Sequence, residues 1–361
     1  MKPGNILRDR IRNLGLDAPR FKQTEDAVRW LGAVQSQDFG PAKWSIGERV
    51  KRATDATVDC AFQEGRILRT HILRPTWHFV LPEDIAWMLE LTGPRVRAGN
   101  AFMDRTLGLD DDTLSEVHVI IRRSLAGGVH LTRKELATAL TRGGEEPAGQ
   151  LLGYIMMSAE LAGLVCSGAM RGKQQTYALL EERAPGTQKL APDEALAELT
   201  LRYFRSHGPA TEKDFRSWSS LTLADIRRGL EMVAGDLERE VIDGTTYWFA
   251  PPVSARHKTA PRVHLLQGYD EYIVGYSESK HLLLPPLVPA SPLATSSYNG
   301  VIILDGRVAG QWKRTIGAKC IAIEARLHTA LGDEAMASFE DAVSRHGAFL
   351  GAEARGSIVG W

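Results

Sequence analysis

The sequence predicts a mainly helical α+β protein, with three tandem winged helix-turn-helix units followed by a C-terminal β-rich domain. Three observations support this fold class. Residues 130–182 and 194–251 repeat one order of elements, in which two helices precede a two-stranded hairpin. Residues 68–80 alternate as a β hairpin does, after a series of helical patterns. From about residue 260 the pattern changes to short strands separated by Gly, Asp and Pro.

Residues 1–90 are expected to combine three helices with one hairpin. The helices are predicted at 5–14, from an acidic turn at 24–26 to about Gln35, and around 44–50. The hairpin at 68–80 should stop before Pro82. Residues 91–129 predict a helical connector, interrupted by Gly93-Pro94 and by an acidic run at 110–112.

The second and third units carry clearer local signals. Thr132 is followed three residues later by Glu135, which is the spacing of a capping box at a helix start. Asp243-Gly244 is typical of a hairpin turn. In the last region we expect strands at 263–266, 272–276, 300–304 and 308–314, and a closing helix from Phe339. The expected domains are therefore 1–90, 91–129, 130–186, 187–255 and 256–361.

Composition limits the partners of the protein. The chain has 361 residues, of which 43% are hydrophobic and 24% charged, as in an ordinary globular protein. Lys and Arg total 44, as do Asp and Glu, so the formal net charge is +0. This balance argues against nucleic-acid binding through bulk charge, although a local basic face can still bind phosphates.

Nothing in the sequence predicts export, a membrane span or a metal site. Residues 1–5 lack the apolar core of a signal peptide, and no apolar run approaches the ~18 residues that a membrane helix requires. Cys60, Cys166 and Cys320 are far apart, form no zinc spacing and predict reduced thiols. We therefore expect a cytoplasmic protein with no metal and no membrane contact.

Two amides and a carboxylate are concentrated at the end of the second predicted helix. Gln35, Gln37 and Asp38 precede Gly40-Pro41, which stops the helical pattern. Residues two apart share a face of an extended chain but not of a helix. Gln35 and Gln37 can therefore point into one site only where the helix unwinds. From spacing alone, two surface glutamines that end a helix are the simpler interpretation.

A Gln-x-Gln before Gly-Pro, followed about thirty residues later by Thr-His-x-Leu-Arg-Pro-Thr-Trp-His, resembles the AlkZ-like DNA glycosylases. Further matches occur at 268–272 and 312–314, so the resemblance spans nearly the whole chain. It implies a bacterial three-winged-helix protein that removes bulky or crosslinked N7-alkylated guanine from double-stranded DNA. It also implies a nucleoid-associated monomer that needs no cofactor. In this family such proteins often protect a producer from its own DNA-alkylating natural product.

The resemblance implies that Gln35 and Gln37 are the catalytic pair. Ser36 departs from the family, which usually has an apolar or small residue there, but both amides remain. Alkylation at N7 makes guanine a good leaving group, so general acid catalysis is needed less. A rigid Gln carbonyl oxygen can place a water and stabilise positive charge on the sugar. Asp38 has an auxiliary role as the base that activates water, or it simply caps the next helix.

Basic residues in several segments are expected to contact DNA. Single basic groups are usually surface ion-pair partners, and Trp77 is more often a core residue than a wedge in DNA. The resemblance favours DNA contact for the hairpin. The expected DNA-binding residues are Arg69, His71, Arg74, His78, Arg133, Lys134, Arg171, Lys173, Lys313 and Arg314. Two alternatives remain: a winged-helix DNA-binding regulator without chemistry, and a catalytically silent homologue that binds modified DNA or free drug.

Overall fold

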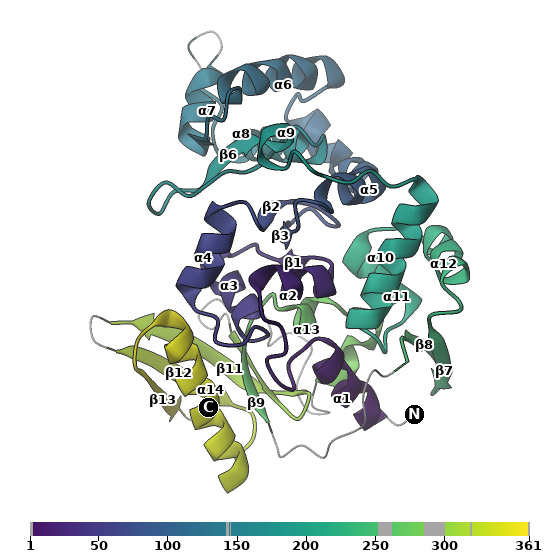
Figure 1. The fold of residues 1–361 in the computed structure, drawn as a ribbon, viewed down its shortest axis with the longest axis vertical. Helices are drawn as coiled ribbons and strands as arrows, with labels where there is room; N and C mark the ends of the chain where they lie inside the picture. The colour runs from purple at the N-terminus through teal and green to yellow at the C-terminus, as the bar shows by residue number, and fades with distance from the viewer. Residues whose placement is uncertain are drawn as a thin grey trace.

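The computed structural model describes residues 3–141, 144, 146–251, 262–284, 300–317 and 320–359. Helices and strands are mixed along the chain, which confirms the α+β character of the prediction. In Figure 1 one lobe lies at the top, and a five-stranded sheet with a helix across it lies at the lower left. The N-terminal part of the chain occupies the centre between them.

The first unit contains a small sheet and the helices around it. Its elements are α1 (Pro3–Asn13), α2 (Thr24–Leu31), β1 (Val34–Gln35), α3 (Phe39–Gly47), α4 (Asp55–Gln63), β2 (Leu68–His71) and β3 (Trp77–Val80). The strands pair antiparallel in the order β1-β3-β2, so the hairpin predicted at 68–80 is confirmed. The helix predicted to reach Gln35 ends at Leu31 instead, because Gly32 has a φ of 81° that breaks helical geometry. Helix α4 has no counterpart among the predicted helices.

The connector contains α5 (Ile85–Thr106) and α6 (Asp111–Leu125). The predicted interruption at Gly93-Pro94 is wrong, because α5 continues through both residues. Val96, one turn later, is buried against Met157 and Leu161, and this packing favours a continuous helix despite the backbone hydrogen bond that Pro94 cannot donate. The predicted break at 110–112 is the start of α6, where Asp110 accepts the N–H of Thr113 at 2.8 Å.

The upper lobe in Figure 1 has its own hydrophobic core. It adds β4 (Leu131–Thr132), α7 (Arg133–Ala139), α8 (Gly149–Leu161), β5 (Val165–Ser167), β6 (Thr176–Leu179) and α9 (Leu180–Arg183) to α6. The predicted capping box is confirmed, since Thr132 and Glu135 each accept the backbone N–H of the other. This core extends from Leu109 to Leu179.

The next unit lies at the right in Figure 1, beside the central N-terminal part. It contains α10 (Pro192–Ser206), α11 (Glu212–Ser219), α12 (Leu223–Met232), β7 (Glu238–Ile242) and β8 (Thr245–Phe249). The hairpin turn predicted at Asp243-Gly244 is confirmed by positive φ angles at both residues.

One order of elements recurs in three described parts of the chain. A short extended segment precedes two helices and then pairs with the second strand of the hairpin that follows them. Strand β1 pairs in this way with β3, and β4 pairs with β6. Ala210 occupies the same place before α11 and α12, and it bridges to Trp248 of β8.

The last region forms a five-stranded sheet in the order β13-β12-β11-β10-β9. Its elements are β9 (Val263–Gln267), α13 (Glu271–Val274), the 3-10 helix η1 (Glu278–Leu283), β10 (Gly300–Leu304), β11 (Arg307–Ile316), β12 (Ile321–Leu327), α14 (Asp333–Leu350) and β13 (Ala354–Val359). The strand predicted at 272–276 is wrong. Asp270 caps a short helix there by accepting the N–H of Tyr272 at 3.0 Å. The closing helix starts earlier than Phe339, and β12 and β13 were not predicted.

The largest core joins parts of the chain that are far apart in sequence. It runs from Leu7 in α1 through α2–α4 and α10–α12 to Phe349 in α14. The first unit (α1 to β3) therefore packs directly against the third unit (α10 to β8) and the last region (β9 to β13). In the described residues, no helix is long and apolar enough to cross a membrane.

Candidate active site

The Gln-x-Gln segment begins on a short strand that pairs with the hairpin. Because α2 ends before it, Val34 and Gln35 are free to pair with β3, where Gln35 lies opposite His78. The N–H of Ser36 donates to the Trp77 carbonyl at 2.7 Å, so the pairing continues beyond β1. Gln35 is only 5% exposed, whereas Gln37 is half-buried. Gln35 thus lies on a paired strand rather than at an unwound helix end, and Gln37 lies in the bend that leads from this strand into α3.

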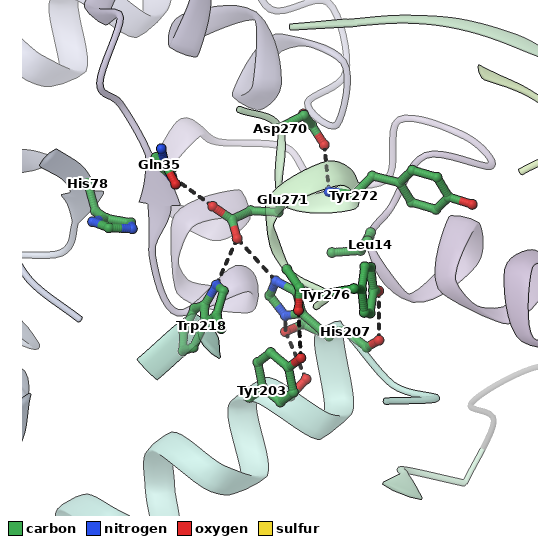
Figure 2. Close-up of polar contacts among 12 residues, drawn as sticks. Leu14, Gln35, His78, Tyr203, His207, Trp218, Asp270, Glu271, Tyr272 and Tyr276 are labelled. Atoms are coloured by element: carbon green, nitrogen blue, oxygen red, sulfur yellow. Dashed lines mark hydrogen bonds and ion pairs between the residues drawn. The ribbon is translucent and has the colours of Figure 1, made fainter. Parts of the chain in front are cut away.

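The carboxylate of Glu271 contacts the backbone of Gln35. It accepts the backbone N–H of Gln35 at 2.7 Å, the indole N–H of Trp218 at 2.8 Å and Nε2–H of His207 at 3.3 Å (Figure 2). Burial disfavours the charged form, yet the hydrogen bond from His207 and the positive charge of Arg74 lower the pKa of Glu271 to about 2. Glu271 is therefore a buried, ionised carboxylate that touches the backbone of the motif.

Arg74 approaches Gln35 from the hairpin. Its Nη2 donates to Gln35 Oε1 at 2.7 Å and to His78 Nε2 at 3.1 Å. Burial and the charge of Arg74 lower the pKa of His78 to about 3, so the ring is neutral and its Nδ1–H donates to the Thr76 carbonyl at 2.9 Å. Gln35 therefore connects an anion and a cation, Glu271 through its N–H and Arg74 through its side-chain oxygen.

Arg69 holds the next part of the motif. Its Nε donates to the Ser36 carbonyl at 3.0 Å, and its Nη2 donates to the Gln37 carbonyl at 3.3 Å. Its Nη1 donates to Gln175 Oε1 at 2.6 Å, and its guanidinium stacks 4.3 Å from the Trp77 ring centroid. Burial lowers the pKa of Arg69 to about 10, which leaves it protonated at neutral pH. With 4% exposure, Arg69 binds protein atoms rather than presenting a free charge to DNA.

A second buried carboxylate, that of Glu160, connects the upper lobe to the β2–β3 hairpin. Glu160 of α8 interacts with Nδ1 of His71 and accepts the indole N–H of Trp77 at 3.2 Å. The His71 and Trp77 rings are in contact, with centroids 4.3 Å apart. His71 is buried and occupied by these contacts, and Trp77 is half-buried between Arg69 and Glu160.

Gln37 and Asp38 are the more accessible members of the motif. Gln37 Oε1 accepts the N–H of Trp77 at 3.4 Å, a long and weak hydrogen bond. Asp38 is exposed and precedes α3, but its side chain makes no capping hydrogen bond. Asp38 also lines a cavity of about 260 Å³ together with Pro41, Trp44, Gln267, Gly300, Trp312, Lys313, Arg314 and His346.

That cavity brings Lys313 and Arg314 close to the motif. Lys313 forms an ion pair with Glu324 at 3.0 Å, and Arg314 Nη1 lies 3.2 Å from His346 Nε2. Burial, followed by the charge of Arg314, lowers the pKa of His346 to about 3, so this ring is neutral too.

The remaining basic residues predicted to bind DNA lie on the upper lobe. Arg171 Nη1 pairs with Glu135 at 2.7 Å, which places the loop between β5 and β6 beside α7. Arg133 Nη2 donates to the Gly149 carbonyl at 2.7 Å. Lys134 and Lys173 are exposed and have no ionic partner among the described residues. These two lysines are the predicted DNA-binding residues with the freest charge.

Several residues of the site were missed by sequence reasoning. Glu271, Glu160, His207 and Trp218 all contact the motif or its immediate neighbours. The available signal was a charged residue inside an apolar stretch, as at Glu160 in α8 and Glu271 before Tyr272. Among the described residues, no group of three or more His, Cys, Asp or Glu side chains is arranged to hold a metal ion.

Comparisons with known proteins place this geometry in context. A family described as DNA glycosylase AlkZ-like matches residues 28–349. The solved structure of Streptomyces sahachiroi DNA glycosylase AlkZ is similar, with a TM-score of 0.82 and 21% sequence identity. The alignment covers 99% of this chain and 100% of that chain. Among curated proteins, no sequence matches this chain.

Proposed function

The chain belongs to the AlkZ-like DNA glycosylase family, and on that premise we propose that it hydrolyses the N-glycosidic bond of bulky or crosslinked N7-alkylated guanine. In this proposal it acts as a monofunctional enzyme, which leaves an abasic site without cutting the strand. The observation that carries the proposal is the segment from Gln35 to Gln37, whose backbone is held by Glu271 on one side and Arg69 on the other.

The two glutamines have different roles in this proposal. Gln37 is half-buried, and its side-chain oxygen Oε1 is bound only weakly, at 3.4 Å from the Trp77 backbone nitrogen. This oxygen can therefore accept a hydrogen bond from water. Gln35 is buried, and its side-chain oxygen Oε1 already accepts a hydrogen bond from Arg74 at 2.7 Å. We therefore assign Gln37 to positioning the nucleophilic water. Gln35 aligns the segment and contributes a polar group beside the sugar.

The chemistry fits a site built from amides. N7-alkylguanine carries a positive charge and leaves without prior protonation, so the enzyme has to orient water and stabilise charge on the sugar. Fixed dipoles do this well when they need not reorganise during the reaction. Asp38 is exposed one residue after Gln37, and it serves as an auxiliary base for the water in this scheme.

We also propose that the recurring order of elements represents three winged-helix units. The short strand, two helices and hairpin around β3, β6 and β8 match that topology. Lys134 and Lys173 on the second of these units then contact DNA phosphates. Self-resistance to a DNA-alkylating natural product is the biological role that the resemblance suggests.

The direct test uses duplex DNA that carries N7-methylguanine or a larger N7-alkylguanine. Release of the modified base, followed by alkaline cleavage at the abasic site, is the expected result for the purified protein. Binding to this DNA without release, under single-turnover conditions with excess enzyme, would contradict the proposal. That outcome would favour a regulator or a silent homologue instead.

A further inference from the structure

We propose that Glu271 is a positioning residue for excision, and that its carboxylate sets the place of Gln35 and so of the whole Gln-x-Gln segment. This inference rests on the proposed glycosylase function and deepens it. It concerns a residue that touches the backbone of the motif rather than the substrate.

Glu271 is completely buried, and both of its carboxylate oxygens accept hydrogen bonds. Its Oε1 accepts the Gln35 N–H at 2.7 Å, while Oε2 accepts Trp218 at 2.8 Å and His207 at 3.3 Å. Figure 2 shows these contacts converging on the carboxylate from two sides. A buried carboxylate is costly unless it is hydrogen-bonded, so an arrangement that satisfies both oxygens resists displacement.

The two donors to Oε2, Trp218 and His207, are themselves held in place by the third unit. Trp218 comes from α11, and His207 follows α10. The His207 ring stacks on Tyr203, with centroids 4.8 Å apart, and its carbonyl accepts the Tyr276 hydroxyl at 2.8 Å. Gly275 allows this approach, because a Cβ there would lie 2.7 Å from the His207 ring. Residues of the third unit thus hold the Glu271 carboxylate in place, and this carboxylate holds the backbone of Gln35 in place.

Arg74 brings the opposite charge to the side chain of Gln35. Gln35 Oε1 accepts Arg74 at 2.7 Å, while its N–H donates to Glu271. The two bonds act on the backbone and on the side chain of the same residue. Moving the carboxylate therefore changes the direction in which the amide of Gln35 points, and through the chain it changes the position of Gln37.

Two substitutions separate position from charge. Glu271→Gln has one oxygen for three donors, so either Gln35 or the pair Trp218 and His207 must lose its acceptor. Glu271→Asp keeps the charge but withdraws it by one methylene, about 1.5 Å. Because the proposal concerns position, we expect both variants to slow single-turnover excision by at least tenfold, with little change in DNA affinity.

The chain offers a matched control in Glu48. This carboxylate is also buried, its pKa is also lowered to about 2, and it also interacts with an imidazole, that of His264 at 3.0 Å. Its other partner is Arg345 at 2.7 Å, outside the motif. Glu48→Gln should lower the melting temperature as Glu271→Gln does, while the excision rate stays at the wild-type value.

Amide hydrogen exchange gives a second measurement that does not depend on activity. Exchange at the peptide that contains Gln35 should be faster in Glu271→Asp, which withdraws the carboxylate from the Gln35 N–H, than in the wild type, and unchanged in Glu48→Gln. If Glu271→Gln does not fold, Trp218→Phe replaces it, since it removes one donor from the carboxylate and should slow excision several-fold.

The outcomes distinguish this inference from the proposed function. A wild type that releases no base from any N7 adduct would overturn the function, and the role of Glu271 with it. An active wild type with equally fast, folded Glu271→Gln or Trp218→Phe would overturn the role of Glu271 alone. A wild-type rate in Glu271→Asp, with slow Glu271→Gln, would show that charge rather than position matters and would also overturn it.

Discussion

The carboxylate of Glu271 accepts the backbone N–H of Gln35 at 2.7 Å, across a separation of 236 residues in the chain. Arg69 approaches the same segment with opposite charge and binds the carbonyls of Ser36 and Gln37. The anionic carboxylate thus accepts the N–H group of the segment, and the cationic guanidinium donates to its carbonyl groups. Both ions are buried, so these contacts are shielded from water and salt.

The two glutamines should differ when they are replaced. Gln37→Ala should slow release of N7-alkylguanine by at least tenfold, about 1.4 kcal/mol of barrier, while the melting temperature stays near the wild-type value. Gln37 is only half-buried and weakly bound, so its loss costs little stability. Gln35→Ala should slow release and also lower stability, because Arg74 loses an acceptor. Gln37→Glu is a useful third variant, since its carboxylate can still activate water. Wild-type single-turnover rates in both Ala variants would exclude a catalytic role for the pair.

Salt dependence should identify the phosphate contacts on the upper lobe. Lys134→Ala and Lys173→Ala should each reduce the log–log salt slope of DNA binding by about 0.9 in magnitude. Both side chains are exposed, so melting temperatures should not change. Binding to duplexes of unrelated sequence, measured between low and moderate salt, provides the slopes. Slopes equal to that of the wild type would place these lysines outside the interface.

Arg69→Ala should act mainly on stability. The guanidinium binds Ser36, Gln37 and Gln175, so its removal leaves three buried or half-buried acceptors without their donor. Each lost partner costs about 1–3 kcal/mol where water cannot replace it. A lower melting temperature with an unchanged salt slope is the expected pair of results. Arg69→Ala with normal stability and a smaller slope would instead indicate a direct phosphate contact.

Stability should fall as the solution becomes acidic. The pKa values of His78 and His346 are lowered to about 3 in the folded protein, against about 6.5 in an unfolded chain. The unfolded state therefore binds more protons, and stability is lost as the pH falls from about 6.5 towards 3. Glu271, with a pKa of about 2, adds a loss below about pH 4.3. Thermal unfolding at pH 7, 6, 5 and 4 and constant ionic strength tests this. A melting temperature that rises on acidification would contradict it.

Gly32 ends α2 just before the motif, and its replacement should be costly. Its φ of 81° is unfavourable for residues with a Cβ, so Gly32→Ala should lower stability by about 1–3 kcal/mol. Gly40→Ala is the control, because a Cβ there would meet no atom within 4 Å and its φ is not positive. Chemical denaturation of both variants gives the comparison. Equal stability of the two would mean that the turn at Gly32 relaxes without cost.

Local patterns predicted much of the fold. The capping box at Thr132, the turn at Asp243 and the hairpin at 68–80 depend on neighbouring residues, so they could be recognised from spacing. Predictions failed where distant packing decides the structure. Helix α5 passes through Pro94 because Val96 packs against α8, and residues 272–276 are helical at their start because Asp270 caps α13.

The candidate site shows the same limit. The motif itself was visible in the sequence, but spacing alone favoured two glutamines at a helix end, whereas the structure pairs Gln35 with His78 of β3. Its supports come from α8, from the third unit and from the segment after β9, none of which is near in sequence. The resemblance favoured Arg69 and His71 as DNA contacts, but the structure buries both, and burial by distant segments cannot be read from an alternating pattern.

Arg69 also ties the motif to the upper lobe. Its backbone N–H donates to the Ser167 hydroxyl at 2.8 Å, and its side chain reaches Gln175, so both ends of the loop between β5 and β6 are bound to one residue. A shift of the lobe would break these contacts and would release the carbonyls of Ser36 and Gln37 as well. Any ligand that favours one placement of the lobe must therefore favour one geometry of the glutamines. By thermodynamic reciprocity, occupancy at the glutamines would bias the lobe by the same coupling free energy.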